Sequence, residues 1–343
     1  MLEILKKRWF LISLAVLIPG GLAIGSQFTA SQLESVKAFF HPRVVIAVVL
    51  LLMAFSLDSR QLKDSFRSPG PVLWASAVNY ALIPLFGLML MPLQRPADFQ
   101  FGLMIVAAVP CTMAAASVWT RRAGGNDAVS LWVTIATNGS CFLVTPFWLN
   151  MKTARVAQLD VREMIFRLLL VVLLPTLAGQ AIRLLRVARK LAVRHKASIG
   201  ATAQACMLTI VFGAACEAGT RLNGMGDRPS LLAVVIVWGS CIAIHLAAMG
   251  IGMAGGRLFG FSRRDIVAVA FAGSQKTLPI AVLLATDETM FGNPDLLGSG
   301  RGVPFAVFPI LMYHTSQMFI DTVIADRLAE NARPAEAAVE PTA

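Results

Sequence analysis

The sequence predicts an all-α polytopic membrane protein with about ten transmembrane helices, and three numbers lead to that prediction. Apolar residues make up 57% of the 343 positions, charged residues make up 14%, and the mean hydropathy is +0.70. Soluble domains average about 45–50% apolar and about 25% charged residues. Since a spanning helix needs about 20 apolar residues, the roughly 195 apolar positions would supply about ten helices. This composition excludes a soluble enzyme, a disordered chain and a protein with a single membrane anchor.

Five apolar segments, separated by turn residues and charges, predict the helices of the first half. They cover residues 9–25, 42–57, 71–92, 99–119 and 128–149. The first follows the basic residues 6–8, as a secretory signal would. Its apolar run is long, however, and no small-residue cleavage site follows, so we expect a retained helix. Asn79 with Pro84 in the third segment, and Pro146 in the fifth, predict kinks or packing contacts.

Five further segments predict the helices of the second half. They cover residues 164–184, 198–217, 229–255, 265–286 and 303–324. Arg167, near the start of the sixth segment, is expected to extend its charge to the interface, and Pro175 and Pro309 predict kinks. Residues 326–343 are rich in Ala, Glu and Pro and predict a short disordered cytoplasmic tail. The transmembrane domain is therefore expected to cover residues 1–325.

Basic residues gather on one side of the predicted membrane domain. That side carries 19 of the 30 Lys and Arg, namely Lys6, Lys7, Arg8, Arg60, Lys63, Arg67, Arg121, Arg122, Arg183, Arg186, Arg189, Lys190, Arg194, Lys196, Arg257, Arg263, Arg264, Arg327 and Arg333. Because cytoplasmic loops are rich in Lys and Arg, both termini are predicted to be cytoplasmic, which requires an even number of crossings. We expect an integral protein of the plasma (inner) membrane, whose net charge of +11 faces anionic lipid and not nucleic acid.

The two halves of the chain have five segments each and opposite orientations, which is the arrangement of an inverted repeat in secondary transporters. The fourth segment of each half is interrupted near its middle. Residues 108–112 read Ala-Val-Pro-Cys-Thr, and residues 272–279 read Ala-Gly-Ser-Gln-Lys-Thr-Leu-Pro. Proline removes a backbone donor and clashes with the preceding turn. We therefore expect discontinuous, crossing helices at positions four and nine, with the binding site between them.

Lys276 is the strongest functional signal in the sequence. It lies about ten residues from either end of its apolar segment, hence about 15 Å from each interface, too far for its side chain to reach water. A charge at that depth costs at least about 2.5–3.5 kcal/mol on insertion scales and usually serves a function. The alternative is a structural cation that satisfies carbonyl groups at the helix break.

Polar residues around both breaks are the other candidates for substrate or ion binding. Beside Lys276 these are Ser274, Gln275 and Thr277, and in segments four and five they are Thr112, Ser117, Thr120, Thr134, Thr137 and Asn138. Such an oxygen-rich set suits a hard cation such as sodium, and no other cofactor is expected. Alternatively, the hydroxyl groups bond back to their own helices. The five cysteines lack metal-ligand spacing and predict buried thiols.

His245 and His314 lie inside the eighth and tenth segments. A histidine inside the membrane is either a packed, hydrogen-bonded residue or part of a proton relay, and the sequence leaves both open. Ser274 with either histidine as base would form an intramembrane hydrolase, but no nucleophile motif with an oxyanion hole accompanies it. The sequence contains no phosphate-binding loop, so primary active transport by this chain alone is not expected.

The two interrupted stretches resemble those of the bile acid:sodium symporter family, most closely its SBF-like branch. The resemblance rests on Pro110-Cys111-Thr112 followed by residues 117–127 (SVWTRRAGGND), and on residues 271–279 (FAGSQKTLP), with Leu57, Asp58, Leu62 and Pro84 in support. It covers about residues 10–325. It implies a core domain of helices near 71–149 and 229–324, and a panel domain of helices near 9–57 and 164–217. It also implies movement of organic anions by alternating access, in many members with sodium.

The chain departs from the sodium-coupled members of that family at three places. Ala116-Ser117 stands where they carry Ser-Asn, Phe271 where they carry an acidic residue, and Lys276 where they carry Asn. A carboxylate and an amide are thus replaced by an apolar group and an ammonium, and fixed positive charge opposes sodium nearby. Lys276 is therefore expected either to stand in for a coupling cation or to pair with the anionic group of the substrate.

The sequence thus predicts a secondary active transporter of an organic anion, either sodium-coupled or sodium-independent, and not an enzyme. One alternative is a non-transporting regulator or scaffold on the same fold, which would bind partners through the basic residues 183–196 or through the tail. The other alternative is the intramembrane hydrolase. The expected partners are a small organic anion and the lipid bilayer.

Overall fold

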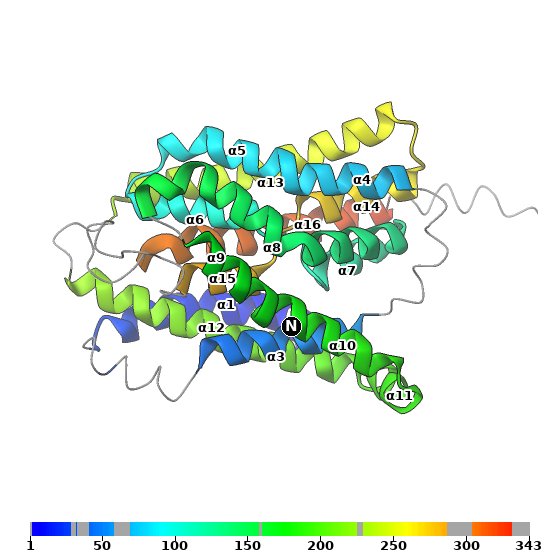
Figure 1. The fold of residues 1–343 in the computed structure, drawn as a ribbon, viewed down its shortest axis with the longest axis horizontal. Coiled ribbons are helices and arrows are strands. Elements are labelled where there is room, and N and C mark those ends of the chain that lie inside the picture. Colours follow the sequence, from blue (N-terminus) through cyan, green and yellow to red (C-terminus); the bar gives the residue numbers. More distant parts are fainter. Residues whose placement is uncertain are drawn as a thin grey trace, which may run out of the picture.

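The computed structural model describes residues 2–28, 32, 41–57, 69–157, 160–224, 229–286 and 304–330, and all regular structure in them is helical (Figure 1). Six helical stretches in these ranges are long and apolar enough to cross a membrane: Pro69–Leu93, Asp127–Met151, Val161–Leu184, Lys196–Thr220, Leu231–Leu258 and Arg263–Thr286. Ile12–Gly25, Pro42–Ser56 and Ala97–Ala108 are shorter apolar helices. These helices fit a polytopic membrane protein, whereas ten crossings in an inverted repeat remain a prediction.

The first half of the chain forms helices at all five predicted segments. They are α1 (Leu2–Gly25), α3 (Pro42–Ser56), α4 (Pro69–Ala77), the π-helix η2 (Val78–Leu82), α5 (Ile83–Leu90), the 3-10 helix η3 (Met91–Leu93), α6 (Ala97–Ala108), α7 (Ala115–Arg122) and α8 (Asp127–Ala157). Asp58 and Leu62, which support the family resemblance, lie outside the described residues.

The second half also forms helices at its five predicted segments. They are α9 (Val161–Arg167), the π-helix η4 (Leu168–Leu173), α10 (Leu174–Leu184), α11 (Arg186–Arg194), α12 (Lys196–Gly224), α13 (Leu231–Leu258), α14 (Arg263–Ser274), α15 (Leu278–Thr286), the 3-10 helix η7 (Pro304–Ala306) and α16 (Val307–Glu330). The predicted start of the tail at residue 326 is five residues too early, because α16 continues to Glu330. Residues 331–343 lie outside the described residues.

Short polar side chains begin several of these helices. Ser230 precedes α13 and accepts a hydrogen bond from the backbone N–H of Ala233, and Ser262 precedes α14 and accepts one from the N–H of Asp265. A side-chain oxygen at this position satisfies one of the free N–H groups in the first helical turn. Each cap therefore defines where a long apolar helix starts.

Two of the predicted spans are interrupted in the middle. Residues 109–114 separate α6 from α7, and residues 275–277 separate α14 from α15. Both interruptions contain or precede the prolines from which they were predicted, Pro110 and Pro279. The interruptions expose backbone N–H and C=O groups inside the protein, and these groups need partners there.

The helices pack as two groups on either side of the interruptions (Figure 1). In one group α1 packs on α12, and α3 packs on α10 and α12. In the other group α14 packs on α4, α7, α8 and α13, and α16 packs on α6 and α13. Small residues allow the closest approach in the first group, where a Cβ added to Gly25 would lie 2.0 Å from the carbonyl oxygen of Cys216.

Candidate functional site

The two interruptions are hydrogen-bonded to each other in the interior. The backbone N–H of Thr277 donates to the carbonyl oxygen of Pro110 at 2.9 Å. The carbonyl ends of α6 and α14 therefore come together, as do the N–H ends of α7 and α15. A helix carries partial negative charge at its carbonyl end and partial positive charge at its N–H end. We call the place where residues 109–114 and 275–277 meet the crossing. It can accommodate a cation beside one pair of helix ends and an anion beside the other pair.

The ammonium group of Lys276 lies at this crossing and is 1% exposed. Its Nζ donates to the carbonyl oxygen of Val109 at 2.8 Å, and to the backbone and side-chain oxygens of Asn79 at 2.7 and 3.1 Å. The ring centroid of Tyr80 lies 5.6 Å away. An ammonium has three N–H groups, so all three have acceptors. In the described part of the chain, no carboxylate forms an ion pair with Lys276.

The oxygens that hold Lys276 are available because the helices around them are irregular. Within η2 the N–H of Ile83 donates to the carbonyl of Val78, five residues earlier. The next donor in this register would be residue 84, which is proline and has no N–H. The carbonyl of Asn79 therefore lacks a helical partner and accepts from Lys276 instead.

The side chains of Asn79 and Gln317 hold the second interruption in place. Asn79 Nδ2 donates to the carbonyl oxygens of Gly273 and Gln275 at 3.2 and 2.9 Å. Gln317 of α16 accepts from the backbone N–H of Lys276 and donates to its carbonyl oxygen, both at 2.9 Å. These amides satisfy backbone groups that would otherwise be unpaired in a membrane interior.

Gln275 belongs to a second buried cluster, formed with His245 of α13 and Asp321 of α16. Gln275 Nε2 donates to Asp321 Oδ2 at 2.5 Å, and His245 Nε2 lies 3.0 Å from Asp321 Oδ1. His245 and Asp321 are both 0% exposed. Gln275 Oε1 is buried and has no hydrogen-bond partner among the described residues.

Ser274 and Thr277 flank the interruption in different ways. The Ser274 hydroxyl donates to the carbonyl of Ala270 at 2.7 Å, one turn earlier in α14. His245 contacts the carbonyl of Ser274 and not its hydroxyl, so no nucleophile–base pair is formed. Thr277 instead lines a cavity, which is described below.

The polar residues predicted at the first interruption do come together there, but their own backbone uses most of their hydrogen bonds. Thr134 and Thr137 donate to the carbonyls of Ser130 and Val133, and Thr137 also accepts from the N–H of Cys111. Further contacts involve Asn138 Nδ2, which donates to the carbonyl of Cys111 at 2.9 Å, and Thr112 Oγ1, which accepts from the N–H of Ala115 at the start of α7. These contacts match the back-bonding alternative.

Ser117 and Thr120 lie farther along α7 and are not hydrogen-bonded to the crossing. The Ser117 hydroxyl donates to Asp127 at the start of α8, and Arg121 forms an ion pair with the same carboxylate at 2.6 Å. The Thr120 hydroxyl is buried, and the described residues provide it with no hydrogen-bond partner. Ser117 is therefore part of a polar link between α7 and α8.

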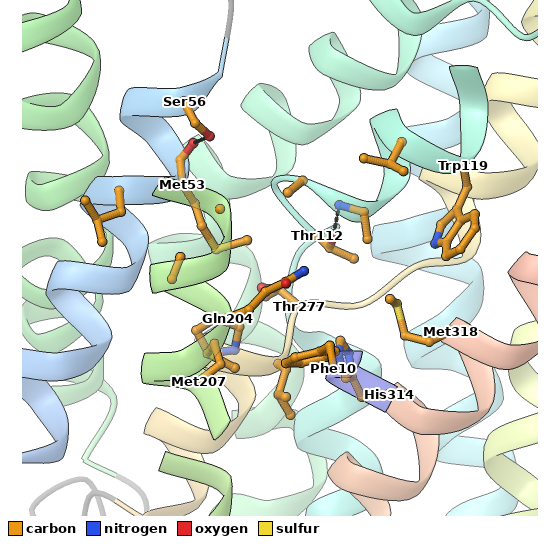
Figure 2. A pocket seen from close by; sticks show the side chains of 18 of the residues that line it. Phe10, Met53, Ser56, Thr112, Trp119, Gln204, Met207, Thr277, His314 and Met318 are labelled. Atoms are coloured by element: carbon orange, nitrogen blue, oxygen red, sulfur yellow. Dashed lines mark hydrogen bonds between the residues drawn. The ribbon is translucent and has the colours of Figure 1, made fainter. Parts of the chain in front are cut away.

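A cavity of about 600 Å³ lies between the two groups of helices and reaches both interruptions. Figure 2 shows side chains from α1, α3, α7, α12, α16 and the interruptions around one common space, among them Phe10, Met53, Thr112, Trp119, Gln204, Met207, Thr277, His314 and Met318. Most of the lining is apolar. The charged side chain of the lining is that of Arg122 in α7, which also pairs with Asp326 of α16 at 2.5 Å.

Three residues of the crossing were absent from the sequence prediction of the site: Asp321, Gln317 and, as a functional residue, Asn79. Asp321 lies only three residues from the predicted end of the tenth segment, where a carboxylate would reach water. Because α16 runs to Glu330, Asp321 lies well inside the helix. A carboxylate within an apolar segment, in a chain with a mid-membrane lysine, was the available signal.

Comparison with protein families gives one match along nearly the whole chain. The model of the SBF-like CPA transporter family (DUF4137) matches residues 8–330. The matched range contains all the residues of the crossing and of the cavity.

Individual relatives share fewer than a third of their aligned residues with this chain, but the alignments cover most of it. A protein named sodium/bile acid cotransporter 7 from Danio rerio is 24% identical over 332 residues, covering 93% of each chain. The protein of the same name from Rattus norvegicus is 21% identical over 335 residues, covering 94% of this chain and 93% of its own. A protein named probable sodium/metabolite cotransporter from Arabidopsis thaliana is 28% identical over 255 residues, covering 71% of this chain and 56% of its own.

Proposed function

Because the chain belongs to the SBF-like CPA transporter family, within the bile acid:sodium symporters, we propose that it carries a small amphipathic organic anion across the bilayer by alternating access. The observation that supports this most directly is the cavity of about 600 Å³ between the two helix groups. Both interrupted spans contribute to its lining, and binding sites of secondary transporters form where broken helices meet. Relative movement of the two groups would open and close it.

The chemistry of the lining supports an anion with a large apolar part. The N–H ends of α7 and α15 border the cavity through Thr112, Ala115 and Thr277, and helix N-termini favour negative charge. Arg122 supplies a cation at the edge of the lining, while Phe10, Trp119 and other apolar side chains form most of its walls. A carboxylate or sulfonate on a hydrophobic body fits this distribution.

We propose that the ammonium group of Lys276 permanently takes the place of the coupling cation that other secondary transporters bind. Its ammonium lies beside the carbonyl ends of the broken helices, and carbonyl oxygens at such ends coordinate the coupling cation in secondary transporters. It is fully buried and does not line the cavity, which argues against direct pairing with the substrate anion. The relatives carry sodium in their names; transport by this chain is proposed to proceed without sodium.

The architecture proposed for this mechanism is the predicted one. α1, α3, α9–α10 and α12 would form the panel domain, and α4–α8 and α13–α16 the core domain, as ten crossings in an inverted repeat. Both termini would lie in the cytoplasm at the plasma membrane, as the distribution of Lys and Arg predicts. The packing of α1 on α12 and of α3 on α10 and α12 supports this division.

The test is uptake of radiolabelled taurocholate by proteoliposomes, in sodium buffer and in matched potassium buffer. Taurocholate is an amphipathic anion whose sulfonate stays ionised, and bile acids appear in the names of the relatives. We expect saturable counterflow that is equal in the two buffers. Strict dependence on sodium would contradict the proposed role of Lys276. A panel of organic anions is selected by thermal shift. Transport itself would be contradicted if neither taurocholate nor these anions showed any flux.

The other two candidates receive less support from the site. The Ser274 hydroxyl bonds to its own helix and lacks a base, which is unfavourable for a hydrolase. A non-transporting regulator would not need a cavity that touches both broken helices, although the basic helix α11 could serve a partner in either case. Partner binding without solute flux would favour the regulator.

A further inference from the structure

His245 and Asp321 form a buried pair that the mechanism above does not use. Both side chains are 0% exposed, and they join α13 to α16 beside the second interruption. On its other edge, His245 Nδ1 lies 3.3 Å from the carbonyl oxygen of Ser274, the last residue of α14. Ionisable groups at this depth are costly, and in transporters they often belong to proton pathways.

Both ring nitrogens of His245 face hydrogen-bond acceptors, and a neutral histidine can donate to only one of them. A carbonyl oxygen only accepts hydrogen bonds, so the contact with Ser274 needs a proton on Nδ1. Nε2 of a neutral ring would then be an acceptor, and it faces a carboxylate oxygen, also an acceptor, at 3.0 Å. Both contacts are hydrogen bonds only when one further proton lies between His245 and Asp321.

We propose that His245 and Asp321 together bind the coupling proton of the transporter, which makes the chain a proton–anion symporter. This inference rests on the proposed transport function and names its coupling ion. With the proton bound, His245 donates to Asp321 and to Ser274. When the proton leaves, a neutral histidine keeps only one of those two donations, so the contact with Asp321 or with the end of α14 is lost.

The surrounding charges agree with a single exchangeable proton. The other ionisable side chains around the pair, within the described residues, are Lys276 beside Gln275, Tyr313 and His314 of α16, Tyr80 of η2, Cys241 of α13 and Cys111 at the first interruption. Tyrosine and cysteine are ordinarily neutral at pH 7. His314 is neutral too, because its Nδ1 accepts from the amide N–H of Gln317. The charge of Lys276 can therefore balance the carboxylate of Asp321. The proton shared by His245 and Asp321 is then the one charge that binds and dissociates during transport.

The geometry connects this proton to the substrate cavity. Ser274 also accepts a hydrogen bond from Tyr313 at 2.9 Å, and the interruption that follows it ends at Thr277, which lines the cavity. A change in the contacts of Ser274 therefore acts on the segment that carries both Lys276 and Thr277. One proton would enter from one aqueous side, bind as an N–H or O–H of the pair, and leave on the other side together with the anion.

Proteoliposomes with an imposed pH gradient test this proposal. With taurocholate as the probe and acid outside, one proton per anion allows accumulation of up to about tenfold per pH unit. We expect accumulation in the wild type, its abolition by a protonophore, and its loss in His245→Gln and Asp321→Asn, with the folding of both variants checked by thermal unfolding in detergent. His195→Gln and Asp160→Asn make the same changes at exposed positions and should accumulate taurocholate like the wild type.

The possible outcomes distinguish a failure of the proposed proton site from a failure of the proposed transport function. Counterflow without pH-driven accumulation in the wild type, or accumulation that persists in both variants, overturns the proton site and leaves transport intact. Absence of counterflow in the wild type removes the proposed function and this inference together. If both variants fail to fold, ¹⁵N NMR of a protein whose other three histidines are replaced reports on His245 alone. A signal that does not change with pH overturns the proposal.

Discussion

At the scale of single residues, the energetics of Lys276 explain how a charge persists at mid-depth without a carboxylate partner. Insertion scales assign such a charge a cost of at least about 2.5–3.5 kcal/mol. Hydrogen bonds to charged groups contribute about 1.5–3 kcal/mol each, and Nζ makes three of them. The three bonds can offset the cost of burial. Because these three acceptors are neutral oxygens, none of them cancels the charge of Lys276, and the carboxylate of Asp321 in the neighbouring cluster can balance it.

Replacing Lys276 by Met is expected to abolish taurocholate uptake. The variant leaves the carbonyl oxygens of Asn79 and Val109 without a donor and removes the resident charge from the crossing. Lys276→Ala should regain part of its activity when methylammonium is supplied, because a small cation can enter the space left by the side chain. Uptake and counterflow are the measurements, and Lys190→Met, an exposed lysine on α11, is the control. Normal uptake by Lys276→Met would refute the role of the ammonium.

Asn79 is expected to stabilise the fold as well as the site. Asn79→Leu removes the donor to the carbonyls of Gly273 and Gln275 and one acceptor of Lys276. Each buried group left unpaired costs about 1–3 kcal/mol, so the thermal unfolding temperature in detergent should fall by several degrees. Asn150→Leu, at an exposed position of α8, should leave it unchanged. Equal unfolding temperatures for the two variants would contradict this assignment.

The residues of the crossing could be predicted from the sequence only where their chemistry was unusual in itself. Lys276 and Gln275 stand out because a cation and an amide interrupt an apolar segment beside Pro279. Asn79 does not, because a single amide in an apolar helix has no distinguishing pattern. Its importance comes from a tertiary contact across 197 positions of sequence, and no local rule supplies that.

At the scale of secondary structure, prolines determine which carbonyl groups are free to hold a cation. Two π-helical stretches, η2 and η4, are each followed by proline, at Pro84 and Pro175. A π-helical turn widens the backbone, and proline withholds the N–H that the next carbonyl would need. In η2 the freed carbonyl belongs to Asn79 and faces the crossing, so the irregular helix supplies a ligand that a regular helix would withhold.

Pro84→Ala is therefore expected to reduce transport without destabilising the protein. The new N–H at residue 84 can donate to the carbonyl of Asn79, which then competes with Lys276 for this acceptor. Uptake should fall, while the thermal unfolding temperature should stay equal or rise, since proline inside a helix costs up to about 3 kcal/mol. Pro146→Ala, inside α8, is the matched control and should not change uptake. A parallel fall in uptake and stability would contradict this explanation.

The elements themselves were more predictable than their ends. Apolar runs and mid-segment prolines were sufficient to predict two interruptions, within residues 108–112 and 272–279, and the structure has them at residues 109–114 and 275–277. The π-helices were not predicted, because proline signals only an irregularity and not its form. Nor was the extension of α16 to Glu330, since Ala and Glu there are as compatible with a helix as with a tail.

At the scale of the whole molecule, the cavity lies on one side of the crossing. Its lining runs from Thr277 and Thr112 at the interruptions to Ser56 at the end of α3, Arg122 at the end of α7 and Thr322 in the second half of α16. Each of the three helices ends on the side that is predicted to carry most of the Lys and Arg. If that side is the cytoplasm, the structure corresponds to an inward-facing state.

Cysteine labelling from each side of the membrane tests this orientation and the cavity together. Ser56→Cys, in a background with the half-buried Cys206 replaced by Ser, should react with a membrane-impermeant thiol reagent in inside-out vesicles and not in right-side-out vesicles. Ser230→Cys, at the opposite end of the fold, should show the reverse pattern. Saturating taurocholate should slow the labelling at residue 56 and leave that at residue 230 unchanged, because only residue 56 lines the cavity.

Labelling of residue 56 from the outside alone would show that the proposed orientation is reversed. Labelling that taurocholate does not slow would separate the cavity from the transport path.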